Sequence, residues 1–334
     1  MLKINTEEIQ KILIIQYQPF GDVLLNTGYL PALRRKFPTA KIDFLVRKPY
    51  HNALLENPDI DELVIFQNGK GTKDYLLERI KLISNIRKRK YDLVIDQIRN
   101  TGSAQITILS GAKYRLGLVN QRWRSYYNLK AERKKLRYYS AMKFDTLAPL
   151  GIEEEKHKLF FHISQDSTEK IKNWFNENNL SGDKLICFSP GTPVKGKQWD
   201  LANYAKLADL IIEKTDCRVL LLWAPNEKED VETVKSFMEN EPIMALPTTF
   251  NEAAAVLKEC RLLVCNDGGL NHLSVATETP SIAFFGKHKP TRWSPASVFK
   301  GYHHFYNESA DYNSDKSLGI PVEQVFSKIK EIVG

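Results

Sequence analysis

Short runs of β-branched and apolar residues alternate along the chain with longer segments whose apolar positions recur at helical spacing. This alternation is typical of parallel sheets built from βαβ units. In the first half the expected strands are 11–16, 41–46, 62–66 and 91–96. After the charged segment 151–158 a second series is expected, at 184–189, 218–223, 261–265 and 281–285. The pattern predicts two Rossmann-like α/β domains, over residues 1–160 and 161–334.

Two helices of the second half have clear sequence signals. Asp200 is a helix-capping residue type and precedes a segment, 201–212, with apolar positions at helical spacing. Pro321, favoured at a first helical position, opens the segment 321–333, whose apolar residues form one stripe. We expect this last helix to end the fold and to pack back toward the N-terminal domain.

The length and composition agree with two domains. The chain has 334 residues, 43% of them hydrophobic, which is too many for one ordinary core. No apolar run approaches the roughly 18 residues needed to span a bilayer, and residues 11–20 lack the flanks of a signal peptide. We therefore expect a cytoplasmic protein. The four cysteines form no C-x-x-C pair and lie in or beside apolar runs, which favours reduced core thiols and no metal site.

The positive charge is unevenly distributed. Residues 1–150 contain 27 Lys and Arg against 14 Asp and Glu, whereas the rest contains 21 against 26. The excess is densest in segment 111–143, where ten basic residues meet one acid, Glu132. Such a run is most often a solvated surface. Because aromatic residues interleave with the charges, nucleic acid and an anionic membrane surface are the alternatives.

A first candidate site follows the first expected strand. Gly21 and Asp22 come directly after it and before a helical run, so Asp22 is predicted to lie at the carboxyl edge of a sheet, where open α/β sheets bind ligands. The alternative is that Asp22 caps the helix. The loop has neither G-x-G-x-x-G nor a Walker pattern, which disfavours a dinucleotide or P-loop site.

A second candidate site combines three loops of the second half. SPGTPVKGKQW follows an expected strand and brings Thr192 and Lys197, a hydroxyl donor and a mobile cation suited to phosphate. Glu227 follows another strand, where it can accept hydrogen bonds from a ribose or cap a helix. The third loop contains residues 267–269.

The turn at residues 267–269 is the strongest local signal. Asp267, Gly268 and Gly269 lie between an expected strand and a short helix, and His272 falls on the first turn of that helix. Glycines before a helix allow an anion to approach the unpaired N–H groups, and the helix dipole favours negative charge. Each feature is common by itself, but together they predict a diphosphate cradle.

Taken in order, these motifs resemble glycosyltransferase family 9, the family of the ADP-heptose:lipopolysaccharide heptosyltransferases. The resemblance covers nearly the whole chain, from KILIIQYQPFGDVLLNTGYLPALRRKFPTAKIDFLV through YDLVIDQIRN and GAKYRLGL to PGTPVKGKQW, NDGGLNHLSVATETPSIAFFG and PTRWSP. It implies a GT-B fold, with the acceptor bound by the N-terminal domain, the nucleotide sugar by the C-terminal domain, and reaction in the cleft between them.

The resemblance also implies roles for single residues. Asp22 matches the catalytic aspartate, which acts as general base on the acceptor hydroxyl in an inverting transfer. The positions that match donor-binding residues are Thr192, Lys197, Glu227, Asp267, Gly268, Gly269 and His272. No cofactor is implied beyond the nucleotide-sugar substrate, ADP-heptose, and a departing diphosphate stabilised by cationic and backbone donors requires no metal.

The basic first half then gains a specific interpretation. Lipopolysaccharide precursors carry phosphates and carboxylates, which a set of arginines can recognise at the inner membrane surface. We expect an anionic glycolipid or glycan acceptor, peripheral contact with the cytoplasmic face of that membrane, no nucleic-acid partner and a monomeric protein. The arginines assigned to the acceptor are Arg99, Arg115, Arg122 and Arg124.

Two departures from the family pattern affect substrate identity. QYQPF replaces the usual serine-rich approach to the glycine-aspartate pair, and Gly268 replaces the usual threonine. Two other classes of protein stay open at this point. One is a sugar-nucleotide epimerase with related twin domains. The other is a basic nucleic-acid-binding protein, which the absence of a recognised binding motif disfavours.

Overall fold

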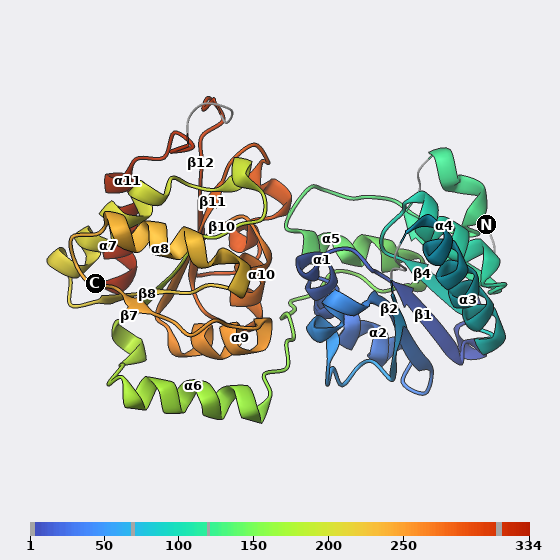
Figure 1. Cartoon of the computed structure of the whole chain (residues 1–334). Helices are drawn as coiled ribbons and strands as arrows, with labels where there is room; N and C mark the ends of the chain where they lie inside the picture. Colours follow the sequence, from blue (N-terminus) through green and yellow to red (C-terminus); the bar gives the residue numbers. More distant parts are fainter. Residues whose placement is uncertain (1–3, 68–70, 119–120, 312–315) are drawn as a thin grey trace. The chain divides into compact units, whose positions relative to one another are not determined.

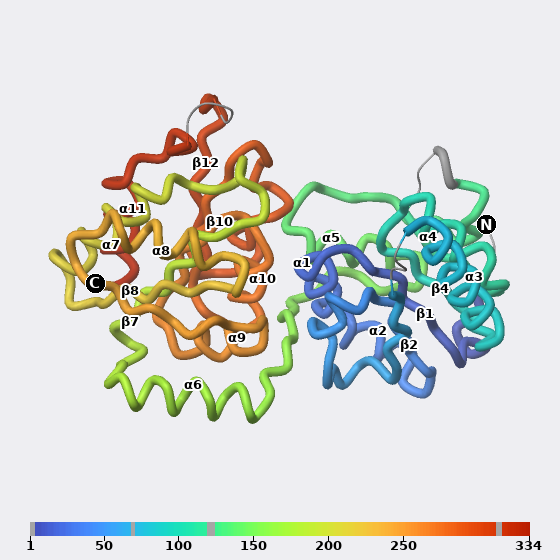
Figure 2. Tube along the Cα trace, in the orientation of Figure 1, coloured from blue at the N-terminus to red at the C-terminus, as the bar shows by residue number. Residues whose placement is uncertain are grey.

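The computed structural model describes residues 4–67, 71–118, 121–311 and 316–334, apart from the side chains of 121–123, and the chain divides into two compact units, Met1–His162 and Ile163–Gly334. Each unit contains one six-stranded sheet with helices packed against it (Figure 1). The chain completes the first unit before it begins the second, as the colour sequence of the trace in Figure 2 shows.

The first unit has a wholly parallel sheet in the order β3-β2-β1-β4-β5-β6. The chain starts in the middle, runs outward to β3, then returns to β4 beside β1. Loops after β1 and β4 therefore leave the sheet in opposite directions, which opens a crevice at their carboxyl ends. The strands are β1 (Lys11–Ile15), β2 (Lys41–Arg47), β3 (Glu62–Phe66), β4 (Leu93–Asp96), β5 (Tyr114–Leu118) and β6 (Leu129–Ala131).

The second unit repeats this topology. Its parallel strands are ordered β12-β11-β10-β7-β8-β9, so the corresponding crevice lies between β7 and β10. The predicted α/β architecture of two Rossmann-like units is thereby confirmed. The strands are β7 (Leu185–Ser189), β8 (Arg218–Leu221), β9 (Ile243–Met244), β10 (Leu262–Asn266), β11 (Ser281–Phe285) and β12 (Tyr302–Tyr306).

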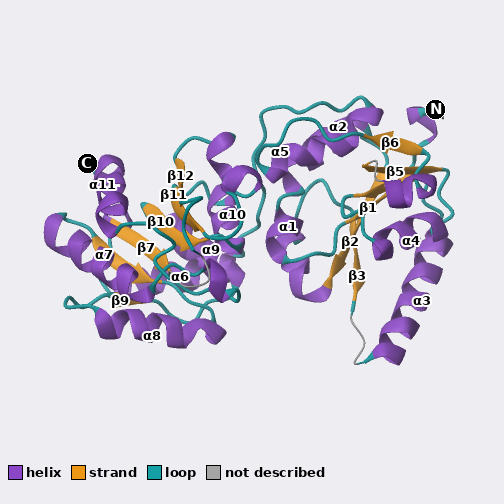
Figure 3. Ribbon diagram, turned by 90° about the horizontal axis from the view of Figure 1, so that it is seen from above, coloured by secondary structure: helices purple, strands orange, loops and turns teal. Residues whose placement is uncertain are grey.

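Helices cover both faces of each sheet, as Figure 3 shows. In the first unit they are α1 (Phe20–Leu24), α2 (Leu30–Lys36), α3 (Thr72–Arg89), α4 (Thr101–Leu109) and α5 (Tyr139–Lys143). In the second they are α6 (Gln165–Glu177), α7 (Leu201–Lys214), α8 (Lys228–Phe237), α9 (Phe250–Glu259), α10 (Gly269–Ala276) and α11 (Val322–Val333). Short 3₁₀ segments are Thr6–Glu8, Thr27–Tyr29, Lys48–Leu54, Gln121–Tyr126, Phe144–Leu150, Gly182–Lys184, Lys195–Lys197, Pro225–Glu227, Pro290–Arg292 and Pro295–Ser297.

Alternation along the strands explains why both faces are covered. Neighbouring strand residues point to opposite sides of a sheet. In β7, Ile186 and Phe188 pack into the core beneath α7, α8 and α11, while Cys187 between them is equally buried on the other face. Strands that are apolar at every position need helices on both faces.

The two predicted helices of the second half are present. The side chain of Asp200 accepts a hydrogen bond from the Ala202 N–H and caps α7, as predicted. Pro321 is the residue before α11 rather than its first residue. α11 packs on α7 and places Val325 and Ile329 in the core of its own unit. Among the described residues, no helix is long and apolar enough to cross a bilayer.

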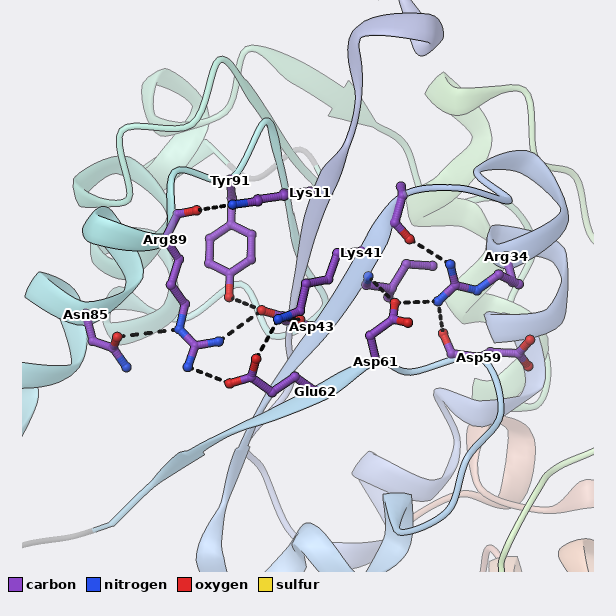
Figure 4. Close-up of polar contacts among 12 residues, drawn as sticks. Lys11, Arg34, Lys41, Asp43, Asp59, Asp61, Glu62, Asn85, Arg89 and Tyr91 are labelled. Atoms are coloured by element: carbon purple, nitrogen blue, oxygen red, sulfur yellow. Dashed lines mark hydrogen bonds and ion pairs between the residues drawn. The ribbon is translucent and has the colours of Figure 1, made fainter.

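An ion-pair network around the buried Asp43 fastens α3 to the sheet of the first unit (Figure 4). Asp43, only 2% exposed on β2, receives hydrogen bonds from the Tyr91 hydroxyl (2.6 Å) and the Arg89 guanidinium (3.1 Å) at the end of α3. Arg89 and Lys41 also pair with Glu62 of β3, each at 2.6 Å, and these bonds lower the pKa of Glu62 to about 2. The network fixes the position of α3 and lies away from the carboxyl ends of the strands.

Candidate active site

The loop after β7 and the loop after β8 touch one another in the second unit. A Cβ atom on Gly191 would lie 2.6 Å from the carboxyl carbon of Glu227, so only glycine allows this approach. Thr192 is buried, and its hydroxyl accepts a hydrogen bond from the Val194 N–H at 3.3 Å. The structure thus brings Thr192 and Glu227 to the same edge of the sheet.

Glu227 both caps a backbone turn and keeps one oxygen available. Its Oε2 accepts a hydrogen bond from the Ala224 N–H at 3.0 Å within the 3₁₀ turn Pro225–Glu227, whereas its side chain makes no capping bond to α8, the helix that follows. Within the part of the chain that the structure describes, Oε1 has no hydrogen-bond partner. Burial raises the pKa of Glu227, against the opposing effect of the Ala224 N–H. An acceptor oxygen in a half-buried position suits a ligand hydroxyl.

Asn266 joins the two strands that border the crevice. Its Oδ1 accepts from the Trp199 N–H and its Nδ2 donates to the Pro190 carbonyl, both at 2.9 Å. The loop after β7 is therefore tied to the end of β10. Asn266 was not among the residues predicted from the sequence, although its place directly before Asp267 was a signal.

Lys197 and Asp267 form an ion pair next to Asn266. The Lys197 ammonium lies 2.5 Å from Asp267 Oδ2, and the side chains are 23% and 4% exposed. The ammonium is thus held at the crevice instead of moving freely in solvent. The Asp267 carboxylate balances the charge of the ammonium.

α10 begins beside this ion pair. Gly268 precedes its first residue, and no side chain caps the first turn. The N–H groups at a helix start have no partner within the helix and favour an anion. Gly268 has an extended backbone (φ −174°), and a Cβ atom there would meet nothing closer than the Asn266 carbonyl oxygen at 3.8 Å.

His272 lies on the first turn of α10 and is 3% exposed. Burial lowers its pKa to about 4, although nearby Asp267 opposes the shift. The imidazole is therefore neutral at pH 7 and can offer one N–H and one acceptor nitrogen. It can hydrogen-bond a ligand but supplies no positive charge.

In the first unit, Asp22 lies in the first turn of α1, after the carboxyl end of β1, and is half-buried. Pro19 occupies the N-cap position and no side chain caps the helix, so Asp22 is not the cap. The helix starts at Phe20, earlier than the sequence indicated, and includes Gly21. The Asn26 amide donates to the Asp22 carbonyl at 2.6 Å, which steadies this turn.

Lys143 is a second charged group near Asp22, and it was not among the residues predicted from the sequence. It ends α5, is 1% exposed, and donates from Nζ to the Gln97 carbonyl at 3.2 Å, just after β4. Burial lowers its pKa to about 7, and the negative charge of Asp22 is the largest opposing influence. Asp22 and Lys143 thus interact electrostatically where the loops after β1 and β4 diverge.

The arginines assigned to an acceptor occupy different environments. Arg99 follows β4 with φ +68°, and its N–H donates to Asp96 Oδ1 at 3.1 Å. Arg115 donates to the carbonyls of Tyr126 (3.0 Å) and Ala112 (2.9 Å), so backbone groups occupy part of its guanidinium. Arg124 is exposed, and the side chain of Arg122 lies outside the described residues.

Much of the basic segment 111–143 is neutralised locally. Lys134 pairs with Glu153 at 2.5 Å, and Arg137 with Glu154 at 2.6 Å. Arg137 also bonds the buried Asp145 at 2.9 Å. The acids at 153–154 fell outside the first-half count, which therefore overstated the free positive charge.

Comparison with known proteins identifies the family. The sequence profile of Glycosyltransferase family 9 (heptosyltransferase) matches residues 79–316. Among curated relatives, lipopolysaccharide heptosyltransferase 3 of Escherichia coli K12 is 26% identical over 285 residues, 82% of each chain. Lipopolysaccharide heptosyltransferase 2 of the same organism is 24% identical over 318 residues, 88% of this chain and 89% of the relative.

Solved structures share the fold. A family 9 glycosyl transferase from Veillonella parvula superposes with a TM-score of 0.85 at 22% identity, covering 97% of both chains. The E. coli heptosyltransferase WaaC, solved with ADP-2-deoxy-2-fluoro heptose, superposes with a TM-score of 0.73 at 19% identity, covering 96% of this chain and 99% of that chain. With the family profile covering most of its length and two Rossmann-like units in GT-B architecture, the chain belongs to glycosyltransferase family 9 and is a glycosyltransferase.

Proposed function

We propose that the protein transfers a heptose from ADP-heptose to a lipopolysaccharide core acceptor with inversion at the anomeric carbon. The names of the curated relatives support the heptose and the acceptor, and the sugar nucleotide bound to WaaC supports the donor. The observation that carries the proposal is the Lys197–Asp267 pair beside the uncapped start of α10, at the crevice between β7 and β10. Diphosphates bind at such positions in open α/β sheets.

Each donor-binding residue contacts a different part of the nucleotide sugar. The Lys197 ammonium and the N–H groups of Gly268 and Gly269 contact the diphosphate, with the Thr192 hydroxyl beside them. Glu227 accepts from the ribose through Oε1, which has no partner among the described residues. Asp267 orients Lys197 and is placed to accept from a sugar hydroxyl, and neutral His272 supplies a directional hydrogen bond.

Asp22 acts as the general base. Its carboxylate takes the proton of the acceptor hydroxyl while that oxygen forms a bond to the anomeric carbon, and the bond from that carbon to the diphosphate breaks. ADP leaves with the electron pair of the broken bond as a stable anion, so no acid has to protonate it. Lys197 and the α10 N–H groups stabilise the departing charge, and the transfer requires no metal.

The acceptor is an anionic glycolipid or glycan precursor. Arg99 and the exposed Arg124 are the strongest candidates to contact its phosphates, joined by Arg115 and Arg122. A glycolipid acceptor is anchored in a membrane, so the proposal places the protein in peripheral contact with the cytoplasmic face of the inner membrane, and we propose that it acts there as a monomer.

The donor assignment is tested by measuring thermal unfolding with ADP, UDP and GDP. A ligand that binds the folded state raises the unfolding temperature according to its saturation. We expect ADP to give the largest increase, and Lys197→Gln to reduce it. A larger increase with UDP or GDP would refute ADP-heptose as donor, and equal increases for wild-type and Lys197→Gln would remove Lys197 from the site.

A further inference from the structure

Exposed large apolar side chains gather on two adjoining helices of the first unit. On α3, Leu76 is 52% exposed, Leu77 56% and Ile80 64%. On α4, Ile108 is 38% exposed and Leu109 46%. We call these five residues the α3–α4 patch. Isolated exposed apolar residues are ordinary, but a group on neighbouring helices indicates an interaction surface.

The patch is separate from the face of α3 that forms the core. Leu82 and Ile86 pack into the hydrophobic core below the helix. Since a helix turns about 100° per residue, Leu77 points about 140° away from Leu82. The outward direction of Leu77 is therefore a consequence of the same geometry that buries Leu82.

Polar contacts join the two helices. Arg87 of α3 donates to the Leu109 carbonyl of α4 at 3.2 Å, and Arg79 donates to the Gly102 carbonyl at 2.7 Å and to Gln105 at 3.0 Å. α3 and α4 lie side by side in Figures 1 and 3. The ion-pair network around Asp43 fixes the end of α3 at Arg89, so the surface is held rigidly.

Positive charge accompanies the exposed apolar residues. Four basic residues of α3 are exposed: Lys73, Lys81, Arg87 and Lys88. On the side of α3 that faces away from the core, Lys73 is followed at helical spacing by Leu77 and Ile80. The acids of α3 lie on its flank, where Glu78 pairs with Lys81 at 2.9 Å. α3 thus carries apolar and basic residues together on the side away from its core.

From this combination we propose that the outward face of α3, with the exposed end of α4, docks on an anionic lipid bilayer. Helices that lie in a membrane interface insert apolar side chains below the headgroups while Lys and Arg contact anionic lipids. A protein partner fits less well because the cores of protein interfaces are depleted in lysine. The inference rests on the membrane contact of the proposed function and assigns that contact to a surface, and it does not depend on Asp22 or the donor site.

Vesicle flotation tests this surface. The full chain is mixed with vesicles of phosphatidylcholine containing phosphatidylglycerol, or of phosphatidylcholine alone, across a salt series. We expect binding to the anionic vesicles only, with loss at high salt because surface charges are screened. Lys73→Gln with Lys88→Gln should weaken binding roughly thirtyfold, since each lysine near a charged membrane contributes about a factor of five.

The apolar contribution is tested with Leu77→Ser and Ile80→Ser together. We expect binding at least about tenfold weaker, since two apolar side chains no longer enter the interface. Phe237→Ser is the matched control, because Phe237 is 55% exposed on α8 of the second unit, and it should bind like wild-type. All three variants should unfold at wild-type temperatures because exposed substitutions alter stability little.

Three results would overturn the inference. They are wild-type vesicle binding by both double variants, equal binding of wild-type to uncharged vesicles, and a wild-type oligomer that the Leu77 and Ile80 substitutions dissociate. Stabilisation by ADP, measured on the same proteins, separates this test from the proposed function. If ADP stabilises every variant and vesicle binding does not change, only the docking surface is wrong.

Discussion

The ammonium of Lys197 lies 2.5 Å from Asp267 Oδ2, although 70 positions separate the two residues in the sequence. Strand order explains the contact, because β7 and β10 are neighbours and their loops diverge at the crevice. Asp267 is 4% exposed and its side chain has little room to move, so it determines the position of the Lys197 ammonium. In the proposed function, the pair holds Lys197 in position for the diphosphate of the donor.

This pair predicts unequal roles for two lysines of one loop. Lys197→Gln should weaken ADP binding roughly tenfold to a hundredfold, because a hydrogen bond to a charged group contributes about 1.5–3 kcal/mol. Lys195→Gln is the control, since Lys195 pairs with Asp230 at 2.8 Å and should leave ADP affinity nearly unchanged. Calorimetric titration measures both. Equal losses would show a general charge effect of the loop.

The buried Lys143 predicts a pH-dependent stability. Its pKa falls from 10.5 to about 7 on folding, so between these values the unfolded chain binds a proton that the folded protein does not. Relative to Lys143→Met, wild-type should therefore lose stability as the pH falls from about 10.5 to about 7, by up to about 1.4 kcal/mol per pH unit, and no further below. Urea unfolding of both proteins across this range measures the difference.

The same experiment tests the link between Lys143 and Asp22. The Asp22 charge favours the ammonium form of Lys143, so in Asp22→Asn the pKa of Lys143 should fall further. The pH range over which the free energy of unfolding changes should then extend to lower pH. Parallel pH profiles for wild-type and Lys143→Met would mean that the lysine is not held in a low-dielectric position. If the lower end of that pH range is the same in Asp22→Asn as in wild-type, the two side chains do not interact.

Two glycines of the donor site should respond oppositely to a side chain. Gly268→Thr, which restores the usual family residue, should be tolerated or slightly stabilising, since the backbone is extended, space is open and threonine caps helices well. Gly191→Ala should displace Glu227, whose carboxyl carbon lies 2.6 Å from the added Cβ, and so weaken nucleotide binding. Unfolding temperatures and ADP titrations distinguish them. Stronger damage from Gly268→Thr would reverse this interpretation.

The sequence predicted most of the fold because the central strands are apolar at nearly every position. The strands it missed are short or polar: β6 and β9 have three and two residues, β5 contains Arg115, and β12 reads YHHFY. The run after β1 was predicted as one helix but divides into α1, a 3₁₀ turn and α2. Hydrophobic periodicity predicts apolar faces well and local breaks poorly.

The candidate site was predictable where residues follow strands, as at Asp22, Lys197 and Asp267. Lys143 was not, because its burial depends on Gln97, 46 positions away, and on the packing of α5. Its place between Met142 and Phe144 was the only sequence signal. The local pairing of the basic segment with Glu153 and Glu154 was likewise invisible, since it needs the folded chain to bring them together.

The rate of sugar transfer by Asp22→Asn tests whether Asp22 is the general base. The substitution keeps the size of the side chain and removes the basic oxygen, so turnover should fall about a hundredfold to ten-thousandfold. Stabilisation by ADP should stay at the wild-type level, because the donor-binding residues are unchanged. Transfer at the wild-type rate by a folded, ADP-binding Asp22→Asn protein would show that Asp22 is not the general base.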